Sequence, residues 1–296
     1  MLAMASSPKA SKWLLFFRMI KFEHSIFALP FAYLGFFLAS PFEFHLDAFL
    51  WVSLAMVSFR TMAMGLNRLI DHSIDALNPR TRLRELPAQL LNRSYVWGWT
   101  LASLGIFLFT CFNLNPLCLQ LAAVPIFLAV LYPFTKRFTW FSHLVLGSVL
   151  GIAPYGAWVA AGQEFSWIPG LISLGVTFWV AGFDMIYALQ DMEFDQKQGL
   201  FSFPAAFGLS TTLMVTRALH LLTLGCWIGA GLLANLGWIY FAGIVGVSFF
   251  LIREHWLVRS FGLQKMNEAF FTMNAFVSVA VLVSVCADVW ILGGAR

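Results

Sequence analysis

The sequence predicts an all-α membrane protein that crosses the bilayer nine times, with its N-terminus on the cytoplasmic side. Of its 296 residues, 60% are hydrophobic and 11% are charged, whereas about a quarter of the residues in a soluble domain are charged. Apolar stretches of membrane-spanning length recur along the chain, and Lys and Arg gather in alternate connections between them. This composition excludes a large soluble protein.

Nine stretches are each long and apolar enough to form a spanning helix, which takes about 20 largely apolar residues. We predict spans over residues 23–40, 47–66, 95–113, 116–133, 141–161, 167–188, 211–233, 236–253 and 270–292. The apolar run WLLFF near the N-terminus is too short to span and is followed by charges, so we expect it to lie at the membrane interface. Because no linker interrupts the chain, we predict a single transmembrane domain over residues 1–296.

The distribution of Lys and Arg determines the predicted orientation. With the N-terminus inside, the outer connections SPFEFHLD, NLN, GQEFS and ANLG contain neither residue, and Arg296 is the one exception on the outer side. The inner segments and inner helix ends carry the other basic residues, in agreement with the positive-inside rule. This rule explains the net charge of +4. Since no basic stripe with interleaved aromatic residues occurs, we expect no nucleic-acid partner.

Two acidic motifs, NRLIDHSID and DMIYALQDMEFD, close the second and the sixth predicted span at their inner ends. Within each motif the polar side chains are three, four or seven residues apart, so they share one face of a helix. They are Asn67, Asp71 and Asp75 in the first motif, and Asp184, Tyr187, Asp191 and Asp195 in the second. GLFSFPAAFG follows the second motif, and its Gly, Ser and Pro predict the turn that ends the sixth helix.

Ionisable side chains at membrane depth are costly, and they persist where they pair, bind an ion or line a cavity. Several carboxylates that face one cavity repel each other unless a positive charge lies between them. Mg²⁺ prefers oxygen ligands and commonly combines a carboxylate or two with substrate phosphates. The motifs therefore predict two Mg²⁺ sites that hold a diphosphate. The alternative is that these acids are solvated helix ends paired with nearby arginines.

A cation-coupled or proton-coupled membrane transporter is the alternative from another functional class, because intramembrane acids also line ion pathways. Such a protein is expected to carry its acids near the midplane of the membrane, on broken helices. In this sequence the acids gather at one end of the spans beside a basic loop, and no pair of spans broken by Gly or Pro is evident. The pattern favours an enzyme.

Basic side chains flank the two motifs. The loop NPRTRLRELPA contributes three arginines, which suit bidentate recognition of phosphate: Arg80, Arg82 and Arg84. Tyr132 and Lys136 lie one helical turn apart at the inner end of the fourth span, where they could hold a diphosphate oxygen. Lys21 opens the first span and could neutralise a substrate carboxylate or a phosphate. Each of these residues also fits a plainer role, as a topology charge, an interfacial aromatic residue or a snorkelling lysine.

Together, and in this order over nine spans, the motifs resemble those of the UbiA-type intramembrane aromatic prenyltransferases over nearly the whole chain. The shared elements are NRLIDHSID, DMIYALQDMEFD, YPFTK, KFEHSIFALPFAY, NPRTRLRELPA and GLFSFPAAFG. The resemblance implies nine transmembrane helices around a central cavity that opens sideways to lipid. It also implies Mg²⁺-dependent transfer of a polyprenyl chain from its diphosphate to an aromatic acid.

By match to the family's motifs, the resemblance implies that two metal ions are held by two sets of residues. The sets are Asn67, Asp71 and Asp75 for one ion, and Asp191 and Asp195 for the other. Because no organelle-targeting segment is visible, we expect the protein in the inner membrane of a bacterium or archaeon. Its active site is then expected to open to the cytoplasmic side.

The chain departs from the family's pattern at two positions. Many members carry Asn-Asp at the start of the first motif, where this chain has Asn67-Arg68, so we expect Arg68 to face the diphosphate and not a metal ion. Lys21 stands where similar members often carry Arg, and Lys cannot make the bidentate fork. The resemblance implies that Tyr132, Lys136 and the loop arginines help to bind the diphosphate.

Asp184 lies about two helical turns, roughly 10 Å, deeper than Asp191, which is too far to share its metal ion. We expect Asp184 and Asp191 to be the catalytic residues, with Asp184 accepting the phenol proton of the acceptor. Tyr187 would shape the acceptor pocket, and Lys21 would face the acceptor carboxylate. The acceptor is either 4-hydroxybenzoate, on the way to ubiquinone, or a dihydroxynaphthoate, on the way to menaquinone. Family frequency favours 4-hydroxybenzoate.

Overall fold

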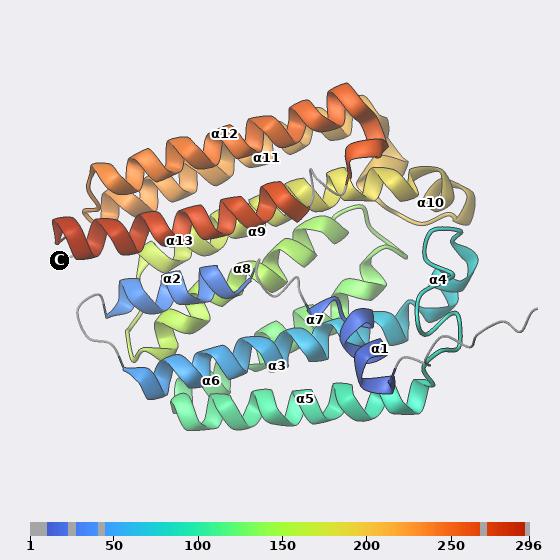
Figure 1. Ribbon diagram of the computed structural model, residues 1–296, viewed down its shortest axis with the longest axis horizontal. Helices are drawn as coiled ribbons and strands as arrows, with labels where there is room; N and C mark the ends of the chain where they lie inside the picture. The colour runs from blue at the N-terminus through green and yellow to red at the C-terminus, as the bar shows by residue number, and fades with distance from the viewer. Residues whose placement is uncertain (1–10, 23–27, 41–44, 267–270, 294–296) are drawn as a thin grey trace, which may run out of the picture.

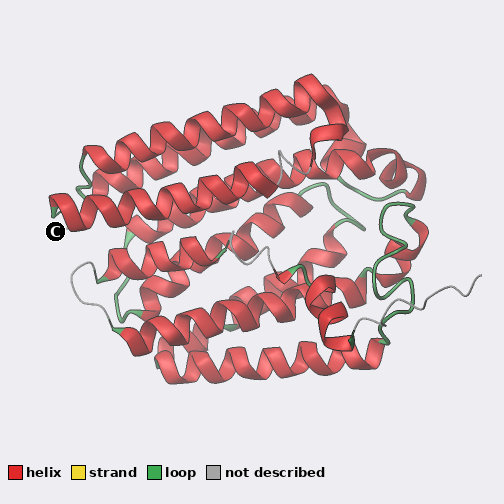
Figure 2. Ribbon diagram, viewed as in Figure 1, coloured by secondary structure: helices red, strands yellow, loops and turns green. Residues whose placement is uncertain are grey.

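The structure, a computed structural model, describes residues 11–22, 28–40, 45–266 and 271–293. Within these residues the chain forms helices and loops, without strands (Figure 2). The α-helices are α1 (Lys12–Met19), α2 (Leu29–Ala39), α3 (Leu46–Ile70), α4 (His72–Leu77), α5 (Arg93–Leu114), α6 (Pro116–Leu121), α7 (Ala123–Thr135), α8 (Ser142–Ala160), α9 (Trp167–Ala188), α10 (Met192–Gln198), α11 (Phe203–Leu233), α12 (Trp238–Phe261) and α13 (Met273–Leu292). Two 3₁₀ turns are η2 (Leu189–Asp191) and η3 (Gly262–Lys265).

Eight helical segments in the described part of the chain are long and apolar enough to cross a membrane. They correspond to eight of the nine predicted spans, so the prediction of an all-α membrane protein is confirmed. The first predicted span, 23–40, overlaps α2, which has only 11 residues; residues 23–27 lie outside the described part. The count of nine spans and the cytoplasmic N-terminus stay predictions.

Several helices begin or end away from the predicted positions. α12 continues to Phe261, beyond the predicted end at 253, because a helix does not stop where charged residues begin at the membrane surface. α11 begins at Phe203 and is kinked at Gly208, where φ is 76° and ψ is 175°. Glycine adopts such a conformation without steric cost. The kink lies close to the predicted start of this span at 211. The turn predicted after the second motif is confirmed by Gly199, which ends α10 with φ 65°.

Two apolar clusters hold the bundle together, and α2 and α8 contribute to both. One cluster joins α2, α8 and α9 to α11–α13 around the buried rings of Trp179 and Trp227. The other joins α2, α3 and α5–α8 around Phe36 and Phe59. Since lipid is as apolar as these side chains, close packing and not escape from water stabilises such contacts. α2 and α8 therefore lie between the two halves of the bundle.

Helices α8 and α9 approach each other closely at two glycines of α8. A Cβ atom on Gly147 would lie 2.3 Å from the carbonyl oxygen of Thr177, and one on Gly151 would lie 2.7 Å from the carbonyl oxygen of Ser173. Two small residues four positions apart are a common basis for pairing of membrane helices. This contact fixes the register of the two helices and places the start of α8 beside Asp184 of α9.

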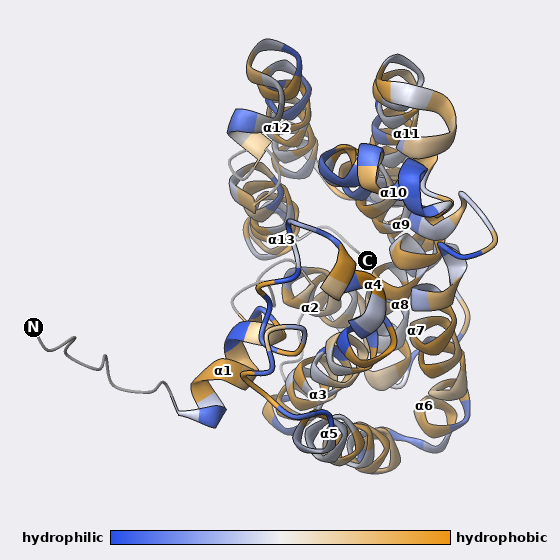
Figure 3. Cartoon of the chain, turned by 90° about the vertical axis from the view of Figure 1, so that its right-hand side faces the viewer, coloured by the Kyte–Doolittle hydropathy of each residue, from blue (hydrophilic) through white to orange (hydrophobic). Residues whose placement is uncertain are grey.

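Both acidic motifs lie at the same end of the molecule. α4 and α10, which carry the ends of the motifs, lie opposite the C-terminal end of α13 (Figure 1). Viewed toward this end, hydrophilic residues of α4, α10 and the connections stand in front of largely hydrophobic helices (Figure 3). The fold therefore brings two polar segments, more than 100 residues apart in the sequence, to one rim.

Candidate active site

A cavity of about 660 Å³ lies between the helices and is lined by both acidic motifs. Its polar lining comes from the ends of α3, α7 and α9 and from the loop after α4, whereas its deeper lining on α3, α5, α7 and α8 is apolar. Every site residue predicted from the sequence lines this cavity except Arg82, which is exposed. The cavity thus joins a charged mouth to an apolar interior.

Asp71 lies at a break between α3 and α4, where a continuous helix was expected. Its φ of −87° and ψ of 3° fall in the sparsely populated bridge region, where active-site residues often lie. Backbone hydrogen bonds nevertheless continue through the break, from Asp71 N to Asn67 O at 3.0 Å and from Asp75 N to Asp71 O at 2.8 Å. The three side chains therefore stay close together, and Asn67 Nδ2 donates to Asp71 Oδ2 at 3.0 Å.

The charge on Asp71 is unfavourable in its surroundings. Burial and the neighbouring Asp75 raise the pKa of Asp71 to about 6, although Lys136 and two arginines oppose the shift. One of these arginines, Arg137, has its Nη2 atom 3.9 Å from Asp71 Oδ1. A cation placed between the carboxylates of Asp71 and Asp75 would favour the ionised form of Asp71.

Asp75 is held by two arginines. Arg84 donates from Nη1 to both carboxylate oxygens of Asp75 at 2.8 Å, and Nη1 of the buried Arg68 lies 3.8 Å from Asp75 Oδ2. Arg68 also donates from Nε to the carbonyl oxygen of Met19 at 3.4 Å. Arg68 thus lines the cavity, and its partners in this structure are Asp75 and the end of α1.

Asp191 repeats the backbone break seen in the first motif. It is the last residue of η2 and directly precedes α10, with φ −104° and ψ 1°. Its Oδ1 atom accepts hydrogen bonds from Arg80 Nε at 2.8 Å and from Asn78 Nδ2 at 2.9 Å. Burial lowers the pKa of Arg80, but the hydrogen bonds to Asp191 outweigh it and raise that pKa above its ordinary value. The loop after the first motif is therefore bound directly to the second motif.

Asp195 carries a buried oxygen that lacks a partner. The residue is 2% exposed, and its Oδ2 atom makes no hydrogen bond with any described residue. A buried carboxylate oxygen without a partner costs free energy. Lys136, at the end of α7, lines the same cavity. A cation bound beside Asp195 would offset the cost of burying its charge.

The donor atoms of the two motifs suit Mg²⁺, because they are oxygens. In the part of the chain that the structure describes, no group of three or more His, Cys, Asp or Glu side chains is arranged to hold a metal ion by itself. Arginines occupy the carboxylates instead, as described for Asp75 and Asp191. These residues therefore fit a metal site in which phosphate oxygens complete the coordination, and not one formed by protein atoms alone.

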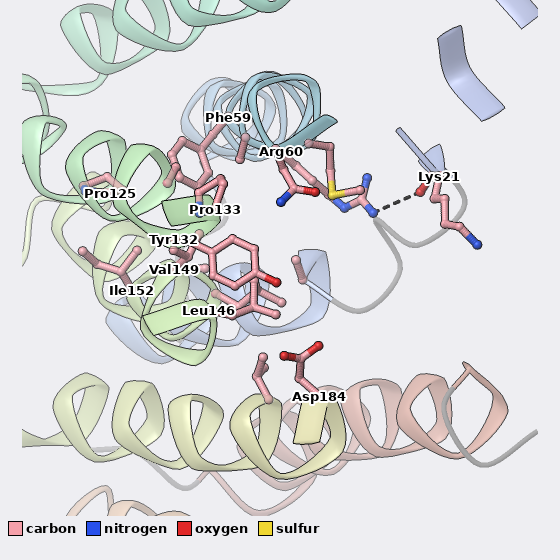
Figure 4. A pocket seen from close by; sticks show the side chains of 18 of the residues that line it. Lys21, Phe59, Arg60, Pro125, Tyr132, Pro133, Leu146, Val149, Ile152 and Asp184 are labelled. Atoms are coloured by element: carbon pink, nitrogen blue, oxygen red, sulfur yellow. Dashed lines mark hydrogen bonds between the residues drawn. The ribbon is translucent and has the colours of Figure 1, made fainter. Parts of the chain in front are cut away.

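Asp184 lies on α9 in the deeper part of the cavity. It and Tyr132 extend into the same space from α9 and α7 (Figure 4). His143, at the start of α8, does not line the cavity but contacts Asp184, with its Nδ1 atom 2.7 Å from Asp184 Oδ2. The deeper part of the cavity therefore contains a carboxylate that is already oriented by a neighbour.

Two cations line the cavity near the start of the first predicted span. The guanidinium of Arg60, on α3, donates to the carbonyl oxygens of Ile20 at 3.2 Å and of Lys21 at 3.0 Å (Figure 4). The Lys21 ammonium lies 5.3 Å from the ring centre of Phe271. Tyr187 packs against the same ring. These contacts place positive charge and aromatic surface beside the mouth.

The structure adds residues that we did not assign to the site from the sequence: Asn78, Arg60, Arg137 and His143. Arg60 precedes Asn67 by seven residues, so the same helical spacing that defines the motifs could have found it. Asn78 opens the arginine-rich loop, and Arg137 follows Lys136. His143 lies outside every motif, and only the packing of α8 on α9 reveals its partner.

Comparison with known proteins identifies the family. The sequence model of the UbiA prenyltransferase family matches residues 28–278 of this chain. The chain belongs to the UbiA prenyltransferase family. A 4-hydroxybenzoate octaprenyltransferase from Vibrio atlanticus (strain LGP32) is 32% identical over 238 residues, which are 80% of this chain and 83% of the relative. A protein of the same name from Francisella tularensis subsp. novicida (strain U112) is 28% identical over 232 residues, 78% of this chain and 81% of that one.

Solved structures of UbiA homologues share the fold. The apo structure of the homologue from Aeropyrum pernix K1 has a TM-score of 0.81 and 31% identity, covering 90% of this chain and 98% of that one. The homologue from Archaeoglobus fulgidus bound to GPP and Mg²⁺ has a TM-score of 0.66 and 20% identity, covering 92% and 99%. The resemblance stated from the motifs is thereby confirmed. As a member of the UbiA family this chain is a membrane-bound prenyltransferase, and the alternative of a transporter is set aside.

Proposed function

We propose that this UbiA prenyltransferase transfers a polyprenyl chain from polyprenyl diphosphate to 4-hydroxybenzoate, in a Mg²⁺-dependent step of quinone biosynthesis. The observation that carries the proposal is the meeting of two aspartate motifs and their arginines at the mouth of an apolar cavity. The names of the relatives from Vibrio and Francisella support the choice of acceptor. We place the enzyme in the cytoplasmic membrane as a single domain, with its mouth on the cytoplasmic side.

Arginine and lysine side chains at the mouth would bind the diphosphate. Arg80 and Arg84 line the cavity while they pair with Asp191 and Asp75, and a guanidinium fits phosphate as well as carboxylate. When the diphosphate enters, each guanidinium can exchange its carboxylate for phosphate oxygens and release the carboxylate for a metal ion. Lys136 adds a further positive charge. Arg82, which is exposed, is left out of this proposal.

The released carboxylates would hold Mg²⁺. We assign one ion to Asn67, Asp71 and Asp75, and the other to Asp191 and Asp195. Bound there, Mg²⁺ supplies positive charge that neutralises the leaving diphosphate. The unpartnered oxygen of Asp195 and the raised pKa of Asp71 support this assignment, because both indicate carboxylates that a nearby cation would stabilise.

The acceptor would lie deeper than the diphosphate, beside Asp184. An aromatic acid with a phenol requires a base at one end and positive charge at the other. Asp184 precedes Asp191 by seven residues, which places it about two turns, roughly 10 Å, deeper. Arg60 precedes Asn67 by seven residues as well, so it lies at a similar depth on α3. We assign Asp184 to accept the phenol proton, which activates the adjacent ring carbon for attack. Arg60 and Lys21 supply positive charge for the carboxylate.

The apolar interior of the cavity would hold the prenyl tail and keep water away from the allylic cation. The rings of Phe59, Phe107 and Tyr132 line it, and aromatic faces attract cations. Along α3 the lining continues to Val52, which is about 22 Å from Asn67 at the rise of an α-helix. The interior is therefore long enough for several isoprene units.

A dihydroxynaphthoate remains the second candidate acceptor, since it also carries an acid and a phenol that these residues would serve. The test offers both acceptors together to the purified protein in detergent, with Mg²⁺ and geranyl diphosphate, and identifies products by mass spectrometry. We expect prenylated 4-hydroxybenzoate. Prenylated dihydroxynaphthoate alone would select the second candidate, and the absence of any prenylated product would overturn both.

A further inference from the structure

His143 lies behind Asp184 when the pair is viewed from the cavity. Asp184 lines the cavity and His143 does not; the histidine is fully buried at the start of α8. The two side chains meet through His143 Nδ1 and Asp184 Oδ2, which are 2.7 Å apart. The histidine is therefore placed to influence the carboxylate without touching a substrate.

The other ring nitrogen identifies the tautomer of His143. The backbone N–H of Phe203 donates to His143 Nε2, with the two nitrogen atoms 3.4 Å apart. Phe203 is the first residue of α11, where a backbone N–H has no acceptor within its own helix. Because an amide N–H can only donate, Nε2 is the unprotonated nitrogen of a neutral ring. Nδ1 then carries the proton and donates it to the hydrogen bond with Asp184.

This arrangement determines which of the two groups accepts a proton from the substrate. A second proton on His143 would have to sit on Nε2, facing the N–H of Phe203, in a fully buried position. The carboxylate of Asp184 is thus the better acceptor. With Oδ2 engaged by the histidine, Oδ1 is the oxygen that remains for the acceptor.

We propose that His143 is a positioning residue, which holds the Asp184 carboxylate with one oxygen directed at the phenol of the acceptor. The inference rests on the proposed function and adds the residue that prepares its base. Because His143 lies outside the cavity lining, it affects turnover of the bound acceptor and not binding of the diphosphate.

The connection between α10 and α11 keeps this arrangement in place. Phe201 N donates to the carbonyl oxygen of Lys136 at 2.7 Å, and Leu200 N donates to that of Asp195 at 2.9 Å. The same connection ends with the Phe203 amide that holds His143. The sequence GLFSF, which follows the second motif, therefore does more than form a turn. Its backbone N–H groups bind Lys136, Asp195 and His143.

Three substitutions separate the hydrogen bond from the volume of the ring. In His143→Asn the amide nitrogen can occupy the place of Nδ1 and still donate to Asp184. His143→Gln carries its amide nearer to the place of Nε2, and His143→Leu removes both nitrogens. Ser142→Ala is the matched control, since Ser142 is equally buried and its hydroxyl has no hydrogen-bond partner among the described residues.

Prenyl transfer from geranyl diphosphate to 4-hydroxybenzoate is measured with each variant. We expect kcat to fall about ten- to a hundred-fold in His143→Leu and His143→Gln, as a misplaced catalytic group does. The Asn variant and the Ser142 control should keep most of the activity. The KM for geranyl diphosphate should stay unchanged in all four, whereas a fold defect would alter it too.

The combination with Asp184→Asn gives the decisive readout. If His143 acts through Asp184, adding His143→Leu to Asp184→Asn causes little further loss, because the two substitutions remove one function. Additive losses, a raised KM for geranyl diphosphate or a fully active His143→Leu would each overturn the role of His143 and leave the proposed function standing. If the Leu variant does not fold, the contrast between Gln and Asn carries the same test. A wild-type protein that prenylates no acceptor would instead overturn the proposed function.

Discussion

Arg80 and Asp191 join the two acidic motifs across 111 residues of sequence: the guanidinium Nε donates to Oδ1 at 2.8 Å, and Nη2 donates to Oδ2. Arg80 also donates from Nη1 to the hydroxyl of Tyr187 at 3.1 Å. The loop that follows the first motif is therefore anchored on the second. Under the proposed function, Arg80 exchanges Asp191 for phosphate oxygens when a diphosphate enters between the motifs.

The first prediction concerns Arg80. Arg80→Ala should raise the KM for geranyl diphosphate about ten- to a hundred-fold, since a hydrogen bond to a charged group contributes about 1.5–3 kcal/mol. Arg80→Lys should recover only part of this, because an ammonium lacks the fork of the guanidinium. Steady-state kinetics at saturating acceptor measure the effect. Arg82→Ala is the control, as Arg82 is exposed and outside the cavity lining; equal losses in both Ala variants would contradict the assignment.

The second prediction separates the base from the metal ligands. Asp184→Asn should lower kcat about 10²- to 10⁴-fold, the usual contribution of a general base. Binding of Mg²⁺ and geranyl diphosphate should be preserved, because Asp184 lies about two helical turns deeper than Asp191 and is not among the proposed metal ligands. Turnover and equilibrium binding are measured on the same preparation. An equal loss of Mg²⁺ affinity would show that Asp184 belongs to the metal site and not to the acceptor site.

Part of this site could be predicted from local spacing. The positions of Asn67, Asp71 and Asp75, four residues apart, indicate a shared helical face, and the structure keeps them together across a break that the spacing does not reveal. Strong apolar runs likewise predict the spans, although α12 continues past its apolar part to Phe261. Local sequence patterns predict that a helix forms and which residues share a face, but they predict the ends of the helix less well.

The partners of these residues could not be predicted, because they come from other helices. Nothing near Asp191 in the sequence indicates that Arg80 and Asn78 bind it. His143 stands alone in its segment, and its contact with Asp184 depends on how closely α8 and α9 pack. Contacts of this kind follow from tertiary packing, which a periodic pattern does not encode.

The third prediction concerns the metal. Chelation with EDTA should abolish prenyl transfer, and Mg²⁺ should restore it. Asp195→Asn should raise the Mg²⁺ concentration for half-maximal activity by about tenfold or more, since a tenfold change corresponds to only about 1.4 kcal/mol. Glu193→Gln is the matched control on α10, because Glu193 is exposed and does not line the cavity. A normal Mg²⁺ dependence in Asp195→Asn would exclude this residue as a ligand.

The fourth prediction concerns the prenyl tail. Ala153 is buried and lines the apolar interior on α8, about 10 Å along the helix from Leu146 near the site. Ala153→Phe should fill this part of the cavity and lower kcat/KM about tenfold or more for octaprenyl diphosphate, as an overpacked side chain costs about 1–3 kcal/mol. Dimethylallyl diphosphate should react as before.

Two comparisons control for damage to the fold in this experiment. Ala153→Leu adds less volume and should have a smaller effect on the long donor. Leu101→Phe adds an aromatic ring to an exposed position of α5 and should change neither donor. Equal losses with the short and the long donor in Ala153→Phe would show that the interior does not hold the tail.

The central claim is that the two aspartate motifs form one Mg²⁺-dependent site that ionises a prenyl diphosphate. The most direct measurement is release of inorganic diphosphate from geranyl diphosphate by the purified protein, with 4-hydroxybenzoate present and Mg²⁺ varied. We predict release that requires Mg²⁺ and is lost in Asp71→Ala and in Asp191→Ala alike. Release without Mg²⁺, or release that survives either substitution, would contradict the claim.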